Sequence, residues 1–170
     1  MTLIGRIGAL VAALVVVAVA GVYVFGGGPV PVATAFVRAL PYNAGALRVS
    51  APALAKNRGF QGYIRRWQAR DAALGWREIQ GPVYVDVVSQ DLLSAKVYVV
   101  SHYAERDRAG GTVNWEQDFA ISEGRSLAGW HVTSVRTTGI ALVDALASLR
   151  PSGPTALIVP PQIYLPEGKR

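Results

Sequence analysis

Few residues in this sequence of 170 have side chains and spacings that could do chemistry. It holds two histidines, His102 and His131, and no cysteine. The lack of cysteine excludes a thiol nucleophile, a cysteine-ligated zinc site and an iron–sulfur cluster. The histidines stand in no metal-binding spacing such as His-Glu-x-x-His, and the Gly-x-Ser-x-Gly, Walker and EF-hand motifs are absent. The sequence therefore predicts no metal, no cofactor and no enzymatic activity.

Charge is distributed unevenly along the chain. Residues 38–77 hold eight basic side chains against a single acid, Asp71, whereas residues 78–170 hold eight basic and ten acidic side chains. Such a basic segment can bind an acidic partner protein or anionic lipid head groups, or it can be a solvated surface. No nucleic-acid partner is expected, because recognition motifs are missing. The candidates for partner binding are four arginines of this segment and three residues near the C-terminus: Arg58, Arg65, Arg66, Arg70, Pro160, Pro161 and Tyr164.

Residues 7–25 form an uncharged run of 19 residues near the N-terminus, IGALVAALVVVAVAGVYVF. As a helix this run would be about 28 Å long, close to the hydrocarbon thickness of a bilayer. The alternative is a cleaved signal peptide with a site after Ala20, but the apolar run continues for five residues beyond that site. We expect a single-pass anchor in a bacterial-type inner membrane. Positive charges close to a membrane helix tend to stay in the cytoplasm, so Arg6 on the short N-terminal side mildly favours a periplasmic C-terminal domain.

The rest of the sequence predicts helices followed by a meandering sheet. Asn57 is an N-cap and Gly75 a C-terminal stop for the clearest helix, residues 58–74, whose apolar side chains recur at helical spacing. Shorter helices are expected over residues 32–40 and, with Ser50 as N-cap, up to residue 56. Gly-Pro and Glu-Gly-Arg turns and a polar loop at residues 105–111 separate the expected strands, which cover residues 76–79, 83–88, 93–103, 112–122 and 127–137.

Helical spacing returns at residues 140–149, and prolines follow in a stiff, extended tail. The predicted organisation is an anchor and hinge over residues 1–28, an α+β domain over residues 29–150, and a proline-rich tail over residues 151–170. The predicted hinge-like linker, residues 26–31, is short, which would hold the domain close to the bilayer.

Residues 115–135 read WEQDFAISEGRSLAGWHVTSV, an alternating strand, an acidic-glycine turn and a strand with a tryptophan. Preceded by helices, this order resembles the nuclear-transport-factor-2-like cone fold, although Gly124 and Trp130 are farther apart than usual and the segment after Gly139 is additional. The resemblance implies N-terminal helices packed on a curved antiparallel sheet. With one membrane helix in front, the chain is similar to bitopic assembly factors of type IV secretion systems. It is also similar to the membrane-proximal module of some penicillin-binding proteins, whose Ser-x-x-Lys motif is missing here.

Cone folds can hold a small ligand between sheet and helices, with a His, Asp or Tyr as general base. The residues that the resemblance suggests for such a pocket are Tyr84, Asp86, Tyr98, His102 and His131. The alternative is that the two histidines are half-buried strand residues with ordinary hydrogen bonds. We therefore expect a non-enzymatic single-pass subunit or assembly factor of a larger membrane protein complex. Such a subunit would bind its neighbours through the basic helices and the tail. The alternative is a tethered cone domain that binds or converts a small molecule.

Overall fold

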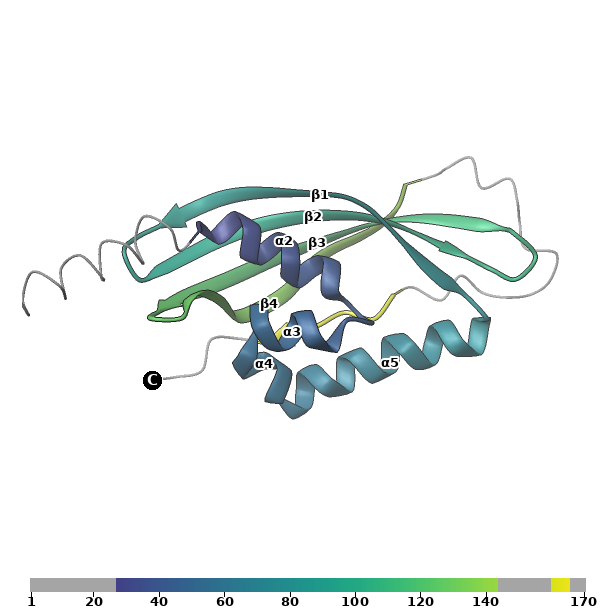
Figure 1. Cartoon of the computed structure of the whole chain (residues 1–170). Helices are drawn as coiled ribbons and strands as arrows, with labels where there is room; N and C mark the ends of the chain where they lie inside the picture. Colours follow the sequence, from purple (N-terminus) through teal and green to yellow (C-terminus); the bar gives the residue numbers. More distant parts are fainter. Residues whose placement is uncertain (1–26, 144–159, 166–170) are drawn as a thin grey trace, which may run out of the picture.

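The computed structural model describes residues 27–143 and 160–165, an α+β domain in which helices pack against an antiparallel sheet (Figure 1). The predicted membrane anchor and residues 144–149 of the predicted later helix lie outside the described residues. None of the helices within the described ranges is long and apolar enough to cross a membrane. The elements are α2 (Pro29–Ala39), α3 (Ala44–Ser50), α4 (Pro52–Lys56), α5 (Arg58–Leu74), β1 (Arg77–Gln90), β2 (Ser94–Arg106), β3 (Thr112–Ser126), β4 (Gly129–Leu142) and β5 (Tyr164–Leu165).

Helix α5 begins and ends where the sequence predicts. The Asn57 side chain accepts a hydrogen bond from the Phe60 amide at 3.1 Å, which satisfies a free N–H of the first turn. Gly75 closes the helix at φ 65°, a left-handed conformation that only glycine adopts at little cost.

The helices before α5 differ from the prediction. Pro29 and Pro31, predicted to lie in a linker, form the first turn of α2, where a missing N–H costs nothing. Helix α3 was not predicted; the Asn43 side chain caps it by accepting from the Ala46 amide at 3.0 Å. Ser50 is the last residue of α3 and not the N-cap of α4, because its hydroxyl donates to the Ala46 carbonyl at 2.8 Å.

The sheet is an antiparallel meander in the order β1-β2-β3-β4-β5. Three predicted breaks are wrong. Gly81 and Pro82 lie within β1, where a register shift absorbs them; β1 is the first strand of the sheet, and an edge tolerates a residue without an N–H. Gly124 pairs with His131, so β3 continues through the predicted Glu-Gly-Arg turn. Residues 140–142, predicted to be helical, end β4 by pairing with residues 115–117.

The described part of the tail belongs to the domain. Tyr164 and Leu165 pair with β4 as strand β5, and Ile163 is buried in the core. The Thr137 amide donates to the Ile163 carbonyl at 2.8 Å.

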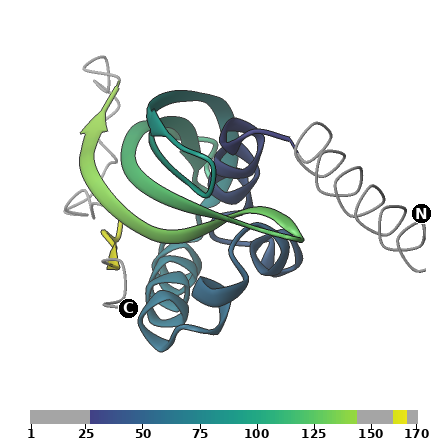
Figure 2. The same ribbon diagram turned by 90° about the vertical axis from the view of Figure 1, so that its left-hand side faces the viewer.

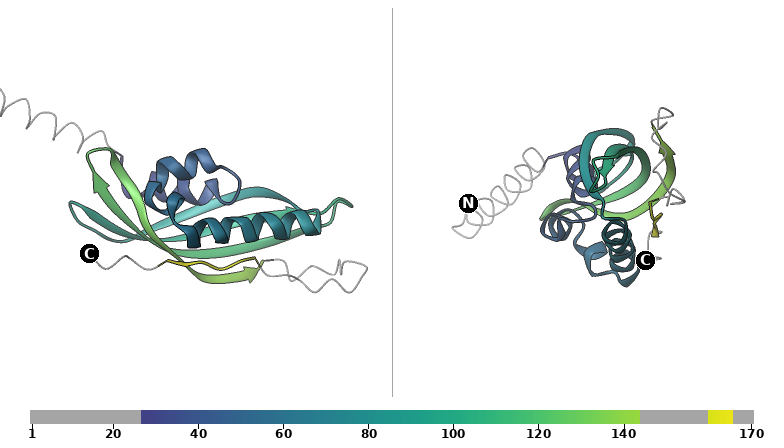
Figure 3. Two further views of the ribbon diagram at one scale, coloured as in Figure 1. Left: turned by 90° about the horizontal axis from the view of Figure 1, so that it is seen from below. Right: turned by 90° about the vertical axis from the view of Figure 1, so that its right-hand side faces the viewer.

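One face of the sheet carries the core, and we call it the inner face. Figures 2 and 3 show the curved sheet with the helices gathered against it. Four ring contacts with centroids 5.7–6.1 Å apart join helices to sheet through Phe36, Phe60, Tyr63, Trp67 and Tyr103. Phe60 and Trp67 share this core with Trp115 and Phe119. The opposite face, which we call the outer face, bears none of the four described helices.

Candidate functional site

The five predicted pocket residues lie on the outer face. Along β2, buried side chains alternate with half-buried ones, and Tyr98 and His102 belong to the second set. Tyr84 and Asp86 pair with residues of that same set, and His131 lies between the buried Trp130 and Val132. A ligand between sheet and helices would therefore not meet these side chains.

The contacts of these residues do not form one site. The ring of Tyr84 meets His102 edge-on at 5.8 Å, and His102 Nε2 lies 3.4 Å from a carboxylate oxygen of Glu116. The Tyr98 hydroxyl donates to Asp118 at 2.7 Å.

His131 is remote from this group. His102 pairs with Glu116 and His131 with Gly124, eight residues farther along β3, which is roughly 26 Å. Within the described ranges, no three His, Asp or Glu side chains stand together as a metal site.

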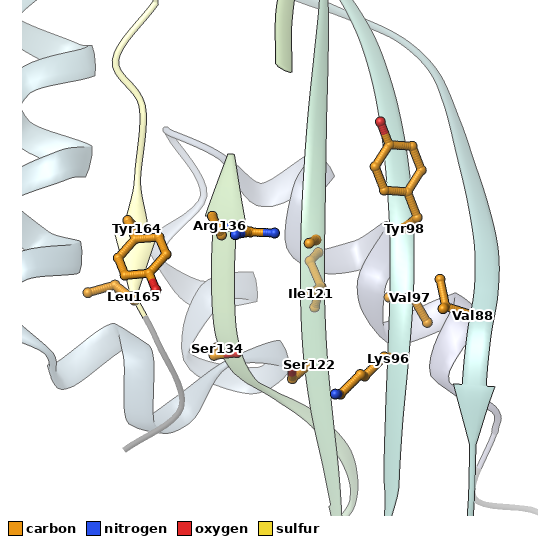
Figure 4. Close-up of a pocket in the computed structure, with 11 residues that line it drawn as sticks. Val88, Lys96, Val97, Tyr98, Ile121, Ser122, Ser134, Arg136, Tyr164 and Leu165 are labelled. Atoms are coloured by element: carbon orange, nitrogen blue, oxygen red, sulfur yellow. The ribbon is translucent and has the colours of Figure 1, made fainter. Parts of the chain in front are cut away.

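A groove of about 410 Å³ crosses the outer face from the end of β1 to β5 (Figure 4). The register places Lys96, Ser122 and Ser134 in one row across three strands, and Arg136 lies beside Tyr164 in the next. Figure 4 shows the side chains of Lys96 and Arg136 pointing toward β3 from the strands on either side of it. The described residues that line the groove supply two cations and several hydroxyls and include no carboxylate, an arrangement that suits small anions.

Arg70, a predicted partner-binding residue, is buried. Its guanidinium makes two parallel bonds to the Glu105 carboxylate, Nη1 to Oε1 at 2.5 Å and Nη2 to Oε2 at 2.8 Å. Trp115 Nε1 donates to the same carboxylate at 2.8 Å. Glu105 has no exposed surface and Arg70 only 9%. Arg70 thus fastens α5 to β2 and is not available to a partner.

Asp71 extends this buried network toward the α2–α3 connection. Arg70 Nη1 lies 3.1 Å from Asp71 Oδ1, and the Tyr42 hydroxyl donates to Asp71 Oδ2. Burial raises the pKa of the Asp71 carboxyl, and the charge of Glu105 raises it further, against the lowering effect of its hydrogen bonds to Tyr42 and Arg70. The guanidinium of Arg70 also stacks 4.9 Å from the Trp76 ring.

A second pocket, of about 470 Å³, opens beside this network. It is lined by Arg38, Ala39, Leu40, Tyr42, Asn43, Glu78 and Gln80. Burial raises the pKa of Glu78 to about 8, and the carboxylates of Asp71 and Glu105 add to the rise. Sequence reasoning missed Glu78, since nothing in its local sequence indicates a half-buried acid with a raised pKa.

Glu78 also borders a smaller cavity of about 10 Å³ toward the core, roughly the space of one water. Trp67 and Gln117 are among the residues that line this cavity. Neither Trp67 Nε1 nor Gln117 Nε2 has a hydrogen-bond partner within the described residues.

The basic helices form a third hollow, which we call the helical groove. It lies between α3, α4 and α5, has a volume of about 280 Å³, and is lined by Ala44, Leu47, Arg48, Ala55, Phe60, Gln61, Ile64, Arg65 and Gln68. Leu47 and Phe60 are buried, whereas the two arginines are exposed. Sequence reasoning found Arg65 but missed Arg48 and the groove itself, because α3 was not predicted.

The other partner-binding candidates surround this groove or lie at the tail. Arg58 and Arg66 are exposed on α5. The ion pairs of the described residues involve none of Arg48, Arg58, Arg65 or Arg66. In the tail, Pro160 is buried, Pro161 half-buried, and Tyr164 65% exposed on β5.

Comparison of the chain with models of protein families, with curated proteins and with solved structures yields no match. The structure identifies the arrangement, N-terminal helices packed on a five-stranded antiparallel sheet, and no family.

Proposed function

We propose that this chain is a non-enzymatic, membrane-anchored subunit of a larger protein complex, and that its helical groove binds an acidic segment of a neighbouring subunit. The groove carries the proposal because it joins an apolar floor to arginines that form no ion pair within the described residues. Leu47, Phe60 and Ile64 supply the floor, and Arg48 and Arg65 stand at its walls.

The chemistry of the groove favours a protein segment with both apolar and acidic side chains. Apolar anchors in a pocket supply most of the affinity at protein interfaces, and charges around them supply specificity and speed of association. Within the described residues, the arginines in and around the groove form no ion pair with an acidic side chain, so their charge is available to an acidic partner. An amphipathic helix with acidic residues beside one apolar edge would complement both features.

The location follows from the sequence. Residues 7–25 would anchor the chain in a bacterial-type inner membrane, with the α+β domain on the periplasmic side. The helices on an antiparallel sheet fit the cone-like arrangement of bitopic assembly factors. Intact-mass measurement tests the anchor: retention of residues 1–20 is expected, and a mature N-terminus at Gly21 would contradict it.

A photo-crosslinking residue at Gln61, on the rim of the groove, tests the binding site in native membranes. We expect one main cross-linked subunit, joined through an acidic segment, and loss of the cross-link in the Arg48→Glu/Arg65→Glu variant. Arg77→Glu is the matched control, because Arg77 is exposed at the start of β1, away from the groove. Equal cross-linking in the groove variant and the control would refute the proposal, as would cross-linking to lipid alone.

A second candidate function, binding of a small polar molecule, is favoured by Glu78. This acid remains largely protonated at neutral pH and faces the 470 Å³ pocket, so it can donate as well as accept a hydrogen bond. A compound from a small-molecule library that raises the unfolding temperature of the wild type but not of Glu78→Leu would support this function. A compound that stabilises both proteins equally would not act through Glu78.

A further inference from the structure

Two hairpin loops at one end of the sheet expose large apolar side chains. Leu92 and Leu93 lie in the β1–β2 loop and are 68% and 62% exposed, and Leu127 lies in the β3–β4 loop and is 88% exposed. Hairpin loops normally carry Gly, Asn, Asp or Ser, so leucines there need a reason.

The leucine side chains do not build the turn they occupy. The Asp91 carboxylate accepts hydrogen bonds from the amides of Leu93 and Ser94, at 2.8 and 2.7 Å, and from the Ser94 hydroxyl at 2.7 Å. The Asp91 amide in turn donates to the Ser94 carbonyl at 2.9 Å. Asp91 and Ser94 thus close the loop through their own polar groups. The turn would form with polar residues in place of both leucines.

The two loops lie side by side. The Arg125 amide, one residue before the end of β3, donates to the Leu93 carbonyl at 2.8 Å. Figures 1 and 3 place both loops at the end of the domain where α2 begins. The loop at the opposite end, between β2 and β3, is polar and contains Asp107, Arg108 and two glycines. Among the described hairpin loops, exposed leucines therefore lie in the two near the start of α2 and not in the loop at the opposite end.

That end of the domain is also where the apolar N-terminal run joins. Pro29 starts α2, and only residues 26–28 separate it from the uncharged residues 7–25. Three residues span at most about 10 Å. An anchor formed by residues 7–25 therefore holds the start of α2, and the loops beside it, close to the bilayer surface.

We propose that Leu92, Leu93 and Leu127 dip into the interface of the bilayer in which the chain is anchored, so that the domain rests on the membrane by this end. The proposal rests on the membrane anchoring proposed above and is independent of the groove partner. The occupant is lipid because the leucines adjoin the predicted anchor and the opposite loop is polar. Lys96, exposed close behind the β1–β2 loop, would meet anionic head groups. The charge of Asp91 at the same tip limits insertion to the interfacial region.

Single-cysteine labelling of the full chain tests the contact, since the sequence has no cysteine of its own. Leu93→Cys, Leu127→Cys and, as the control on the opposite loop, Ala109→Cys would each carry an environment-sensitive fluorophore. Each variant is reconstituted in vesicles of phosphatidylethanolamine and phosphatidylglycerol. Iodide in water and nitroxide-labelled lipid are the two quenchers. Circular dichroism before reconstitution establishes that each variant is folded.

We expect iodide to quench the labels at positions 93 and 127 several-fold less than the label at 109, and lipid nitroxide to quench only the first two. Adding Leu92→Ser and Leu93→Ser to the Leu127→Cys variant should return its label toward water. Equal access of iodide to all three labels would overturn the proposal. Shielding of positions 93 and 127 from both quenchers would overturn it as well, because protein and not lipid would then cover the loops. Charge reversal in the helical groove should leave the quenching unchanged, which separates this test from that of the proposed function.

Discussion

The burial of Glu123 on the inner face of the sheet can be tested through the pH dependence of stability. Its side chain faces the helices from β3 and is 2% exposed, and neither carboxylate oxygen has a hydrogen-bond partner within the described residues. Burial alone raises its pKa to about 8 from an ordinary value of 4.5. At neutral pH the folded chain therefore keeps this group as a neutral acid, because an unpaired buried carboxylate is costly.

The pH dependence follows in sign and size. Above pH 4.5 the unfolded chain loses this proton while the folded chain keeps it until about pH 8, so stability falls as the pH rises through this window and levels off above it. One pH unit of difference is worth about 1.4 kcal/mol, so an interval of about 3.5 units corresponds to at most about 5 kcal/mol. Partial water access would reduce this figure.

Glu123→Gln isolates the effect, because glutamine imitates the neutral acid in size and charge. Its free energy of unfolding should lie near that of the wild type at about pH 5 and exceed it by several kcal/mol at about pH 9. Urea unfolding of the full chain in mild detergent, followed by tryptophan fluorescence, measures both values. Glu116→Gln, on the outer face beside His102, is the matched control. An equal difference between variant and wild type at both pH values would refute the reasoning.

Three further predictions concern stability, measured by the same unfolding assay. Trp67→Ala should cost about 3–5 kcal/mol, as for other large core aromatics, and an unchanged midpoint would mean that α5 packs elsewhere. Arg70→Met should cost about 3–5 kcal/mol of stability because it leaves Glu105 buried without its cation. Adding Glu105→Leu should recover part of this loss. A double variant that is less stable than the single one would contradict the prediction. Gly81→Ala should destabilise the sheet, because its new Cβ would lie 2.6 Å from the His102 carbonyl oxygen, and a variant as stable as the wild type would show that β1 relaxes freely there.

Much of the fold was predictable because local chemistry and packing agree. Asn57 and Gly75 delimit α5 through their own backbone preferences, and the alternation of apolar and polar residues separates the two faces of β2 and β3. The strand ends were not predictable, because residues typical of turns, such as Gly81, Pro82 and Gly124, lie within strands that continue to pair with their neighbours. Gly124 continues β3 opposite His131, whereas the actual turn follows Ser126 and contains a leucine.

The candidate site was predictable only in part. Alternation separates the two faces of a strand, but which face is the inner one depends on where the helices pack. Tyr98 and His102 are four residues apart and so lie on one face of β2, but only the position of the helices shows that this face is the outer one. Likewise, nothing in the neighbouring sequence separates Arg70 from Arg66, since both are arginines of the same predicted helix. What distinguishes it is Glu105, 35 residues away, and no local pattern indicates that pairing.

The interruption of β1 at Gly81 and Pro82 has a consequence for how copies of this chain meet. Among the described strands β1 has a neighbour on one side only, so the backbone groups of its fourteen residues that face away from β2 would be a template for another strand. Pro82 offers no N–H to such a strand, and the register shift at Gln80 and Val83 disturbs the regular ladder that it would need. Uncontrolled growth of the sheet into fibres is thereby discouraged at its longest free edge, in a protein whose proposed anchor would concentrate it in two dimensions.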